Sequence, residues 1–398
     1  MKTPRRAASP VLAAARATFT LAGALGAAVA GAVGYLSLRV ARTAVTPAVR
    51  VADVAVHGFD TAAQTITLAR TPDTVLPGRY GLFTGGTERY LKLGAVLAED
   101  GLSVRRKLLT EVDAGTEIAP FAAFSGWYWL SPEELHVPFT TVSVGTPVGA
   151  CPAWLFPAAG AAADTWVIAV HGRGTTRAEV LRAVPVLHEE GLPVLCVSYR
   201  NDGEAPRSRS GHYGLGATEW RDVDAAVAWA LRNGARRVLL MGWSMGGAIV
   251  LQVALNSSHA EHIAGVVLES PVVDWRLVLG FQAQRMRVPS PVTRLAMGAL
   301  GRSWTSRVIR RGDPISLDDL DIVSRAGELD HPILLLHSDD DGFVPADASH
   351  RLAAERPDLV TLESFRTARH TKLWNYDERR WNEAIREWLR ERSLTSGA

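Results

Sequence analysis

Short apolar runs recur at regular intervals from about residue 140 onward, separated by longer stretches with helical periodicity. Strands buried on both faces of a sheet are continuously apolar, and helices between them are typical crossover connections of a parallel sheet. The predicted strands are 165–170, 192–198, 236–242, 263–269, 332–337 and 359–364, after two strands within 140–158. The pattern predicts an α/β fold with a mostly parallel sheet flanked by helices.

The composition fits this fold and excludes several classes of protein. With 398 residues, 47% of them hydrophobic, the chain can build one large α/β domain plus additions. Two cysteines make no disulfide framework. The net charge of +2 includes seven basic and no acidic residues among the first fifty, which leaves 36 basic against 41 acidic residues elsewhere. This balance gives no support for nucleic-acid binding.

Residues 17–38 carry no charged side chain and lie between Arg16 and Arg39. As a helix this segment would be ~33 Å long, enough to span the hydrocarbon core of a bilayer. We therefore expect a basic N-terminal segment at 1–16, followed by a transmembrane helix or signal anchor.

The expected location is the cell membrane, with a single-pass anchor and the bulk of the chain on the extracytoplasmic side. Four basic residues precede the apolar segment and three follow it before residue 51, a small bias toward a cytoplasmic N-terminus. The alternative is a cleaved signal peptide with Ala28–Ala30 as an A-x-A site, which would make the protein secreted.

Residues 39–136 show a weaker pattern. Residues 61–70 alternate as a strand does, and the aromatic cluster at 121–130 is typical of a core or an interface. We expect a small N-terminal element that contains β-structure and packs on the larger domain, which we assign to 137–398.

The pentapeptide Gly242-Trp243-Ser244-Met245-Gly246 stands between a predicted strand and an apolar, alanine-rich helix. A serine at such a sharp turn needs small residues two before and two after it, which Gly242 and Gly246 supply. Its hydroxyl then projects at a helix N-terminus, where developing negative charge is favoured. Ser244 is the candidate nucleophile, and a glycine-rich turn with a capping serine is the alternative.

The loop after the strand 165–170 reads His171-Gly172-Arg173-Gly174. A backbone N–H of this loop, that of Arg173, can lie over the same point as the N–H of Met245, and together they would form an oxyanion hole. His171 and Gly172 are then supporting residues, and His171 is not the catalytic base.

A serine hydroxyl needs an imidazole to remove its proton and a carboxylate to orient that imidazole. His370 follows the last predicted strand, and three acids, Asp339, Asp340 and Asp341, follow the strand before it. The order serine, acid, histidine is that of an α/β-hydrolase triad. The pattern alone does not choose among the three acids.

Other roles for these residue types are weaker. Three adjacent carboxylates without a calcium-type loop or a Cys/His cluster do not make a metal site, so we expect no metal and no cofactor. We expect His337 to be structural and His350 to lie on a helix surface, and we favour a loop role for His212.

Residues 137–391 resemble the α/β-hydrolase superfamily of serine esterases, lipases and related peptidases, as a bacterial, membrane-anchored member. The resemblance is carried by "HGRG" (171–174), "GWSMGG" (242–247), "DGFVP" (341–345) and "RHTKLWN" (369–375). It implies that the acid is Asp341, because the family's acid typically lies three residues before a Val-Pro pair. Asp340 is the next choice, Asp339 the least favoured of the three, and Glu269 a distant alternative.

More than sixty residues separate the strands ending near Glu269 and beginning at Pro332, more than a crossover helix needs. This interval is apolar and helical, and we expect a helical cap at about 271–330. Eight arginines stand against two acids within 271–315. We hypothesise that this basic face meets an anionic membrane surface or an acidic substrate group; a solvated basic face is the alternative.

Together these features predict a serine hydrolase that cleaves a carboxylic ester of a small molecule or a lipid through an acyl-enzyme. The alternatives are a serine peptidase or amidase, a thioesterase, and a non-catalytic, membrane-tethered binding module. The residues leave the substrate chain length and the oligomeric state open.

Overall fold

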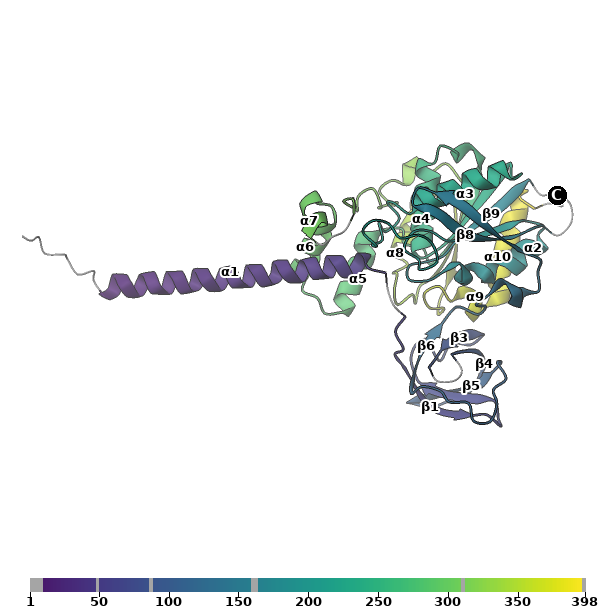
Figure 1. Ribbon diagram of the computed structural model, residues 1–398, viewed down its shortest axis with the longest axis horizontal. Helices are drawn as coiled ribbons and strands as arrows, with labels where there is room; N and C mark the ends of the chain where they lie inside the picture. Colours follow the sequence, from purple (N-terminus) through teal and green to yellow (C-terminus); the bar gives the residue numbers. More distant parts are fainter. Residues whose placement is uncertain (1–9, 48–49, 86–88, 159–163, 309–311, 396–398) are drawn as a thin grey trace, which may run out of the picture.

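The computed structural model describes residues 10–47, 50–85, 89–158, 164–308 and 312–395, and for residues 10–25 the backbone alone. The chain forms a long N-terminal helix, a small β-barrel and a large α/β domain (Figure 1).

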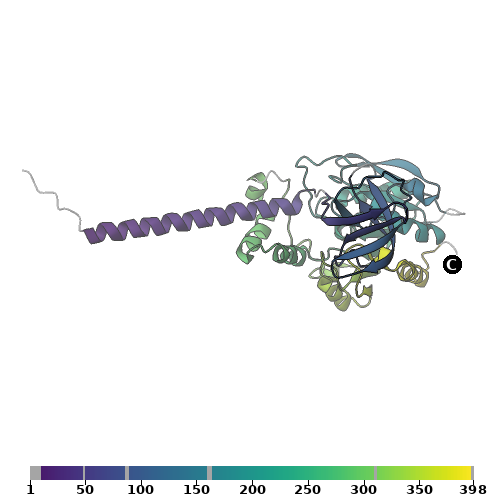
Figure 2. The ribbon, with the colours of Figure 1, turned by 90° about the horizontal axis from the view of Figure 1, so that it is seen from below.

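The helix α1 (Pro10–Val45) projects away from the rest of the molecule, and only its C-terminal end reaches it (Figure 2). Its alanine-rich sequence favours a helix. At the C-terminal end Ala41 and Val45 are buried in the core of the α/β domain, whereas residues 26–32 are exposed.

No helix in the described part of the chain is both long and apolar enough to cross a membrane. The predicted transmembrane helix at 17–38, and the membrane-anchored location that depended on it, are therefore not supported. From residue 26 on, small residues lower the hydropathy, and Arg39 and Arg42 bring charge into the last turns. Residues 1–9 of the predicted basic segment lie outside the described residues.

Six antiparallel strands close a barrel in the order β1-β2-β5-β4-β3-β6. Alternate apolar side chains along these strands, such as Ile66 and Leu68 on β2, fill its interior. The barrel occupies the region in which the sequence predicts a β-containing element. Its strands are β1 (Val54–Asp60), β2 (Thr65–Ala69), β3 (Tyr80–Phe83), β4 (Tyr90–Glu99), β5 (Ser103–Leu108) and β6 (Phe121–Ser125).

Arg106 of β5 is fully buried in the barrel and has no carboxylate partner among its hydrogen bonds. Its guanidinium donates instead to four carbonyls, those of Thr74, Leu76, Gly78 and Gly94, at 2.7–3.1 Å. Burial lowers the pKa of Arg106 to about 10. Arg106 therefore ties the loop after β2 to the strands β4 and β5.

The large domain is built on an eight-stranded sheet in the order β14-β13-β12-β11-β9-β10-β8-β7. The strands from β9 to β14 are parallel, and β7 and β8 form an antiparallel edge. The strands are β7 (Thr140–Thr146), β8 (Gly149–Phe156), β9 (Thr165–Val170), β10 (Val194–Val197), β11 (Arg237–Trp243), β12 (Ile263–Glu269), β13 (Ile333–Ser338) and β14 (Val360–Phe365). The prediction of a mostly parallel sheet is confirmed, and each predicted strand lies within two residues of its observed bounds.

Helices cover both faces of this sheet, each over its own apolar core (Figure 1). One face carries α3 (Trp220–Arg232), α4 (Met245–Asn256) and α8 (Asp347–Glu355); the other carries α2 (Val184–Glu189), α9 (Leu373–Tyr376) and α10 (Glu378–Glu391). Because the strands are parallel, the loops at their carboxyl ends gather at one edge, where the site lies.

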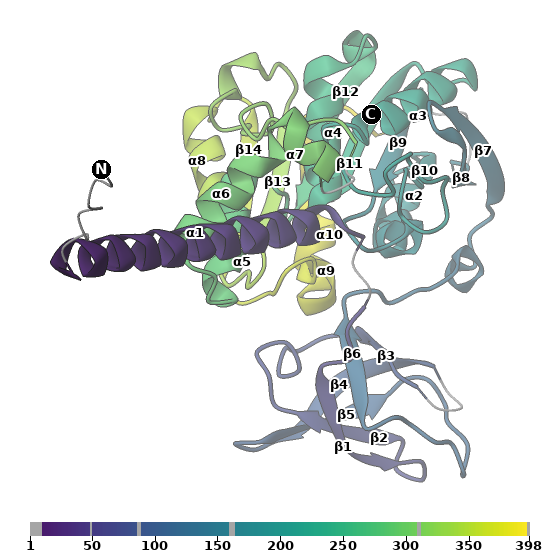
Figure 3. The same ribbon diagram turned by 60° about the vertical axis from the view of Figure 1, so that its left-hand side comes forward.

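Three helices lie between β12 and β13: α5 (Trp275–Arg285), α6 (Ser290–Leu300) and α7 (Ser303–Val308). Figure 3 shows the last turns of α1 crossing α5 and α6. Of the eight arginines predicted to form a basic face, Arg310 and Arg311 lie outside the described residues and Arg276 pairs with Asp318 at 2.7 Å. The role of that face stays a prediction.

Candidate active site

Ser244 stands at the turn between β11 and α4 with φ 51° and ψ −116°, a conformation that costs energy for a residue other than glycine. The flanking glycines allow this turn. A Cβ on Gly246 would lie 2.2 Å from the carbonyl oxygen of Val170, and a Cβ on Gly242 would lie 2.5 Å from that of Gly246. Both positions therefore require glycine, for the steric reason that the sequence suggested.

The structure brings three of the predicted residues into one hydrogen-bonded chain. His370 Nε2 lies 3.0 Å from Ser244 Oγ, and His370 Nδ1 lies 2.7 Å from Asp341 Oδ2. The carboxylate of Asp341 is fully buried, and 18% of the His370 side chain is exposed. With Nδ1–H donated to the carboxylate, Nε2 is the nitrogen that accepts from the serine hydroxyl.

The three consecutive acids have different partners. Asp341 accepts from the backbone N–H groups of Phe343 and Val344, both at 2.8 Å, in addition to its contact with His370. Asp340 pairs with Arg369 at 3.0 Å and Asp339 with His350 at 2.7 Å. Asp341 is thus the one of the three that reaches His370.

Glu269, the distant alternative, is also fully buried but contacts other groups. Its carboxylate accepts from the indole N–H of Trp243 at 2.8 Å and of Trp381 at 3.0 Å. Burial raises the pKa of Glu269 above its ordinary value. Glu269 therefore joins strands and helix beneath the site, away from His370.

His337, which we expected to be structural, lies directly behind Asp341. Its Nε2 is 3.3 Å from Asp341 Oδ2 and 3.1 Å from Val344 O, and its Nδ1 is 2.7 Å from Ser349 Oγ. Burial alone would raise the pKa of Asp341, but His370 and His337 outweigh this and hold that pKa well below its usual range. The signal in the sequence was a histidine at a strand end, four residues before the acid.

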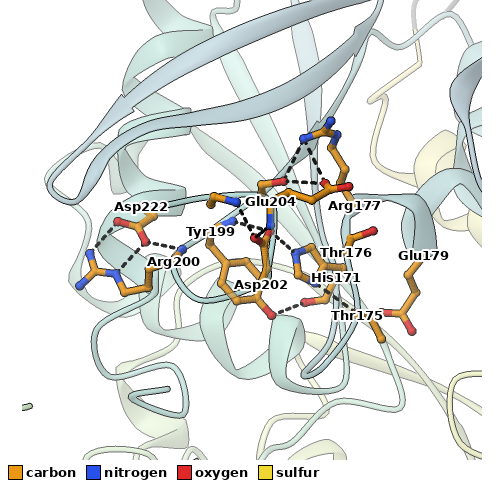
Figure 4. A network of polar contacts seen from close by, with 12 residues as sticks. His171, Thr175, Thr176, Arg177, Glu179, Tyr199, Arg200, Asp202, Glu204 and Asp222 are labelled. Carbon is orange, nitrogen blue, oxygen red and sulfur yellow. Dashed lines mark hydrogen bonds and ion pairs between the residues drawn. The ribbon is translucent and has the colours of Figure 1, made fainter. Parts of the chain in front are cut away.

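The loop 171–175 is held from two sides, as Figure 4 shows. The N–H of Gly172 donates to Glu179 Oε2 at 2.7 Å, and the hydroxyl of Tyr199 donates to the carbonyl of Gly172 at 2.8 Å. His171 stacks on the ring of Tyr199, with centroids 4.3 Å apart, and its Nε2 lies 3.2 Å from Asp202 Oδ2. His171 is therefore a buried support of the loop.

Of the two predicted oxyanion donors, Met245 follows Ser244 in the chain and Arg173 lies in a loop that approaches it. Met245 begins α4, so its N–H has no acceptor within the helix. A Cβ on Gly172 would lie 3.2 Å from the Cβ of Ser244, which shows how closely the loop carrying Arg173 approaches the serine. The Arg173 side chain donates to the carbonyls of Thr43 and Thr46 at the end of α1, at 3.0 and 2.6 Å.

A cavity of about 1010 Å³ opens beside Ser244 between α1 and the helices α5 and α6. In the described part of the chain no group of three or more His, Cys, Asp or Glu side chains is arranged to hold a metal ion. Cys151 and Cys196 are buried and unpaired with each other.

Comparisons with known proteins agree with this architecture. A family model described as an alpha/beta hydrolase family matches residues 167–392, and one described as a domain of unknown function matches residues 55–125, within the barrel region. A Mycobacterium tuberculosis protein described as uncharacterized is 26% identical over 245 residues, 61% of this chain and 75% of that protein. The solved structure of a Pyrococcus furiosus esterase has a TM-score of 0.52 at 18% identity, covering 66% of this chain and 94% of that one. The family match and the likeness in structure confirm the expected α/β-hydrolase fold.

Proposed function

Because the chain belongs to the alpha/beta hydrolase family, we propose that it is a serine hydrolase that cleaves a carboxylic ester through an acyl-enzyme. The observation that carries this proposal is the chain of contacts from Ser244 Oγ to His370 Nε2 and from His370 Nδ1 to Asp341, at 3.0 and 2.7 Å. Such a chain supplies both needs of a serine nucleophile, a base for its proton and a buried carboxylate that fixes the base.

In the proposed reaction, Ser244 Oγ attacks the ester carbonyl while His370 takes its proton. The N–H groups of Arg173 and Met245 donate to the oxyanion that forms. His370 then protonates the leaving alcohol as the carbon–oxygen bond breaks, and the acyl group stays on Ser244. Water, deprotonated by His370, attacks this acyl-enzyme and releases the acid. Asp341 stays ionised throughout and stabilises the imidazolium.

The cavity beside Ser244 favours an ester of an apolar acid over a peptide. Its walls are mostly aliphatic and aromatic, and the charged side chains among its lining are Arg39, Arg42 and Arg173. The guanidinium of Arg173 is already bonded to the end of α1. Arg39 and Arg42 are exposed on α1, and apart from Ser244 the buried side chains of the lining are apolar. A peptidase that binds a chain terminus would need a charged group among those buried side chains.

The proposal is tested by labelling with a fluorophosphonate probe and by hydrolysis of p-nitrophenyl butyrate. We expect Ser244→Ala to abolish labelling and to lower kcat by at least on the order of 10³-fold. The matched control Ser324→Ala, at a distant loop serine bonded to Asp321, should keep both. Labelling that persists in Ser244→Ala, or wild-type protein with no ester hydrolysis, would refute the proposal and favour a binding module.

A further inference from the structure

The cavity beside Ser244 combines helices from two distant parts of the chain. Val278 and Leu279 of α5 and Ala296 of α6 face it from the α/β domain, and Leu38 and Ala44 face it from α1. Its volume of about 1010 Å³ lies at the upper end of the roughly 300–1,000 Å³ typical of small-molecule sites. Ser244 is part of the lining, so a substrate group held in the cavity can be attached directly to the carbonyl that Ser244 would attack.

Large apolar side chains are unusually exposed around this cavity. Four side chains of its lining are exposed: Tyr35 by 64%, Met286 by 65%, Val308 by 59% and Phe343 by 44%. Phe343 also contacts the ring of His370, with centroids 5.1 Å apart. Exposed apolar surface gathered at one place marks a binding site, because covering it removes that surface from water.

The C-terminal end of α1 is fixed against the α/β domain, so the side chains of α1 form a fixed wall of the cavity. The N–H of Tyr213 donates to Val45 O at 2.8 Å, and Arg173 donates to the carbonyls of Thr43 and Thr46. Ala41 and Val45 are 1% and 0% exposed and belong to the core of the α/β domain. These residues lie far outside the segment 167–392 that matches the hydrolase family.

We propose that this cavity holds a long, unbranched hydrocarbon acyl chain of the ester substrate, with the last turns of α1 as one of its walls. The inference rests on the proposed function, since it needs the acyl carbon at Ser244. A mostly apolar cavity recognises methylene groups by burying them, at a gain of about fourfold in kcat/KM for each methylene.

The test uses p-nitrophenyl esters of unbranched acids from two to twelve carbons, below their solubility limits, on the full chain. In the wild type, kcat/KM should rise with acyl length until the chain fills the cavity. Ala44→Trp, which places an indole in the wall from α1, should lose on the order of tenfold or more on the long esters. Its loss on the acetate and butyrate esters, whose acyl groups are too short to fill the cavity, should be much smaller than its loss on the long esters.

Ala32→Trp is the matched control, because it makes the same substitution on the exposed part of α1. It should keep the wild-type dependence on chain length. A wild-type kcat/KM that is flat with acyl length would overturn the inference without any variant. If Ser244-dependent labelling and short-ester hydrolysis remain in that case, the proposed function stands and the acyl site alone fails. In a second series, acetate esters of unbranched alcohols, a kcat/KM that rises with the alcohol chain while the acyl series stays flat would also overturn the inference.

Discussion

The helix α1 and the β-barrel both precede the segment that matches the hydrolase family, yet they contact the site by different chemistry. The end of α1 presents small and aliphatic side chains to the cavity beside Ser244. The barrel contacts the segment around His370 through charges and hydrogen bonds. Asp73, in the loop after β2, lies 2.9 Å from Lys372 Nζ and 3.8 Å from Arg369 Nε.

The barrel's contacts continue along the same segment. Arg79 and Asn375 exchange two hydrogen bonds, from Arg79 N to Asn375 O at 3.2 Å and from Asn375 Nδ2 to Arg79 O at 2.7 Å. Gly126, just after β6, is packed so closely that a Cβ there would lie 2.6 Å from the carbonyl oxygen of Thr371. The barrel therefore contacts the side chain of the residue before His370 and the backbone of Thr371 and Asn375 after it.

The difference predicts which kinetic property the helix α1 and the barrel can each change. A wall of the proposed acyl cavity selects among substrates, so cavity-facing variants that leave α1 docked should act on long esters and spare short ones. A support of the histidine acts on the proton transfer that every ester shares, so barrel variants should lower kcat for all chain lengths alike.

The comparison needs a reference variant outside both α1 and the barrel. Asp341→Asn is such a variant, and its expected effect is the largest. The amide leaves His370 without a carboxylate, and we expect kcat to fall on the order of 10⁴-fold on every ester. Asp340→Asn, the matched control next to it in sequence, should cost far less. Equal losses in the two variants would contradict the assignment of Asp341.

Asp341→Asn should also change how the stability of the protein depends on pH. The folded-state pKa of Asp341 is below its unfolded value of about 3.9, so its contribution to stability is fully present above that pH and is lost as pH falls through the folded pKa. Below about pH 4 the unfolding free energy of the wild type should fall as the pH is lowered. The fall should be smaller in Asp341→Asn, which lacks this carboxylate. Urea unfolding at several acidic pH values measures this difference.

Arg106→Met tests whether the barrel acts as a unit. The substitution leaves four buried carbonyls without their donor, and we expect the barrel to lose about 3–5 kcal/mol of stability. With the barrel unfolded, kcat should fall equally for short and long esters. Arg105→Met, an exposed neighbour on β5, is the control, and thermal unfolding is the measurement. A loss confined to long esters would break the comparison.

Gly126→Val tests the contact with Thr371 directly. The added side chain must displace the backbone next to His370, and displacements of about 1 Å in an active site cost on the order of 10²-fold. We expect kcat to fall about 10- to 100-fold at all chain lengths. Gly101→Val adds the same side chain where nothing lies within 4 Å of the Cβ and should leave kcat unchanged.

Asp73→Asn should have the smallest effect. Its ion pairs are one-third exposed on the aspartate side, so they are screened by water and salt. We expect a fall in kcat of about two- to threefold at low salt, independent of acyl length, which disappears in about 0.5 M salt. A salt-independent loss would show that the carboxylate acts otherwise than through charge.

The central sheet could be predicted because each buried strand is a continuous apolar run with a clear length. The turn at Ser244 could be predicted for the same local reason, since glycines at 242 and 246 are needed by sterics alone. Asp341 could not be chosen from the residues, because three adjacent carboxylates differ only in which loop backbone and which histidines surround them.

The structure of the N-terminal third could not be predicted from local sequence patterns. The barrel closes by pairing β1 with β6, strands some sixty residues apart in the chain, and no local signal specifies that closure. Residues 17–38 have the composition of a weak membrane span. The structure adds that the last turns of α1, which include Ala41 and Val45, pack against α6 and the core of the α/β domain.

Arg173 joins two tasks in one residue. Its backbone belongs to the loop beside Ser244, while its guanidinium is occupied by the carbonyls at the end of α1. Were α1 to detach, this half-buried cation would lose both acceptors and the loop would lose an anchor at the same moment. Undocking of the helix would thus act directly on the proposed active site, because it would open the cavity and loosen the proposed oxyanion donors at the same time.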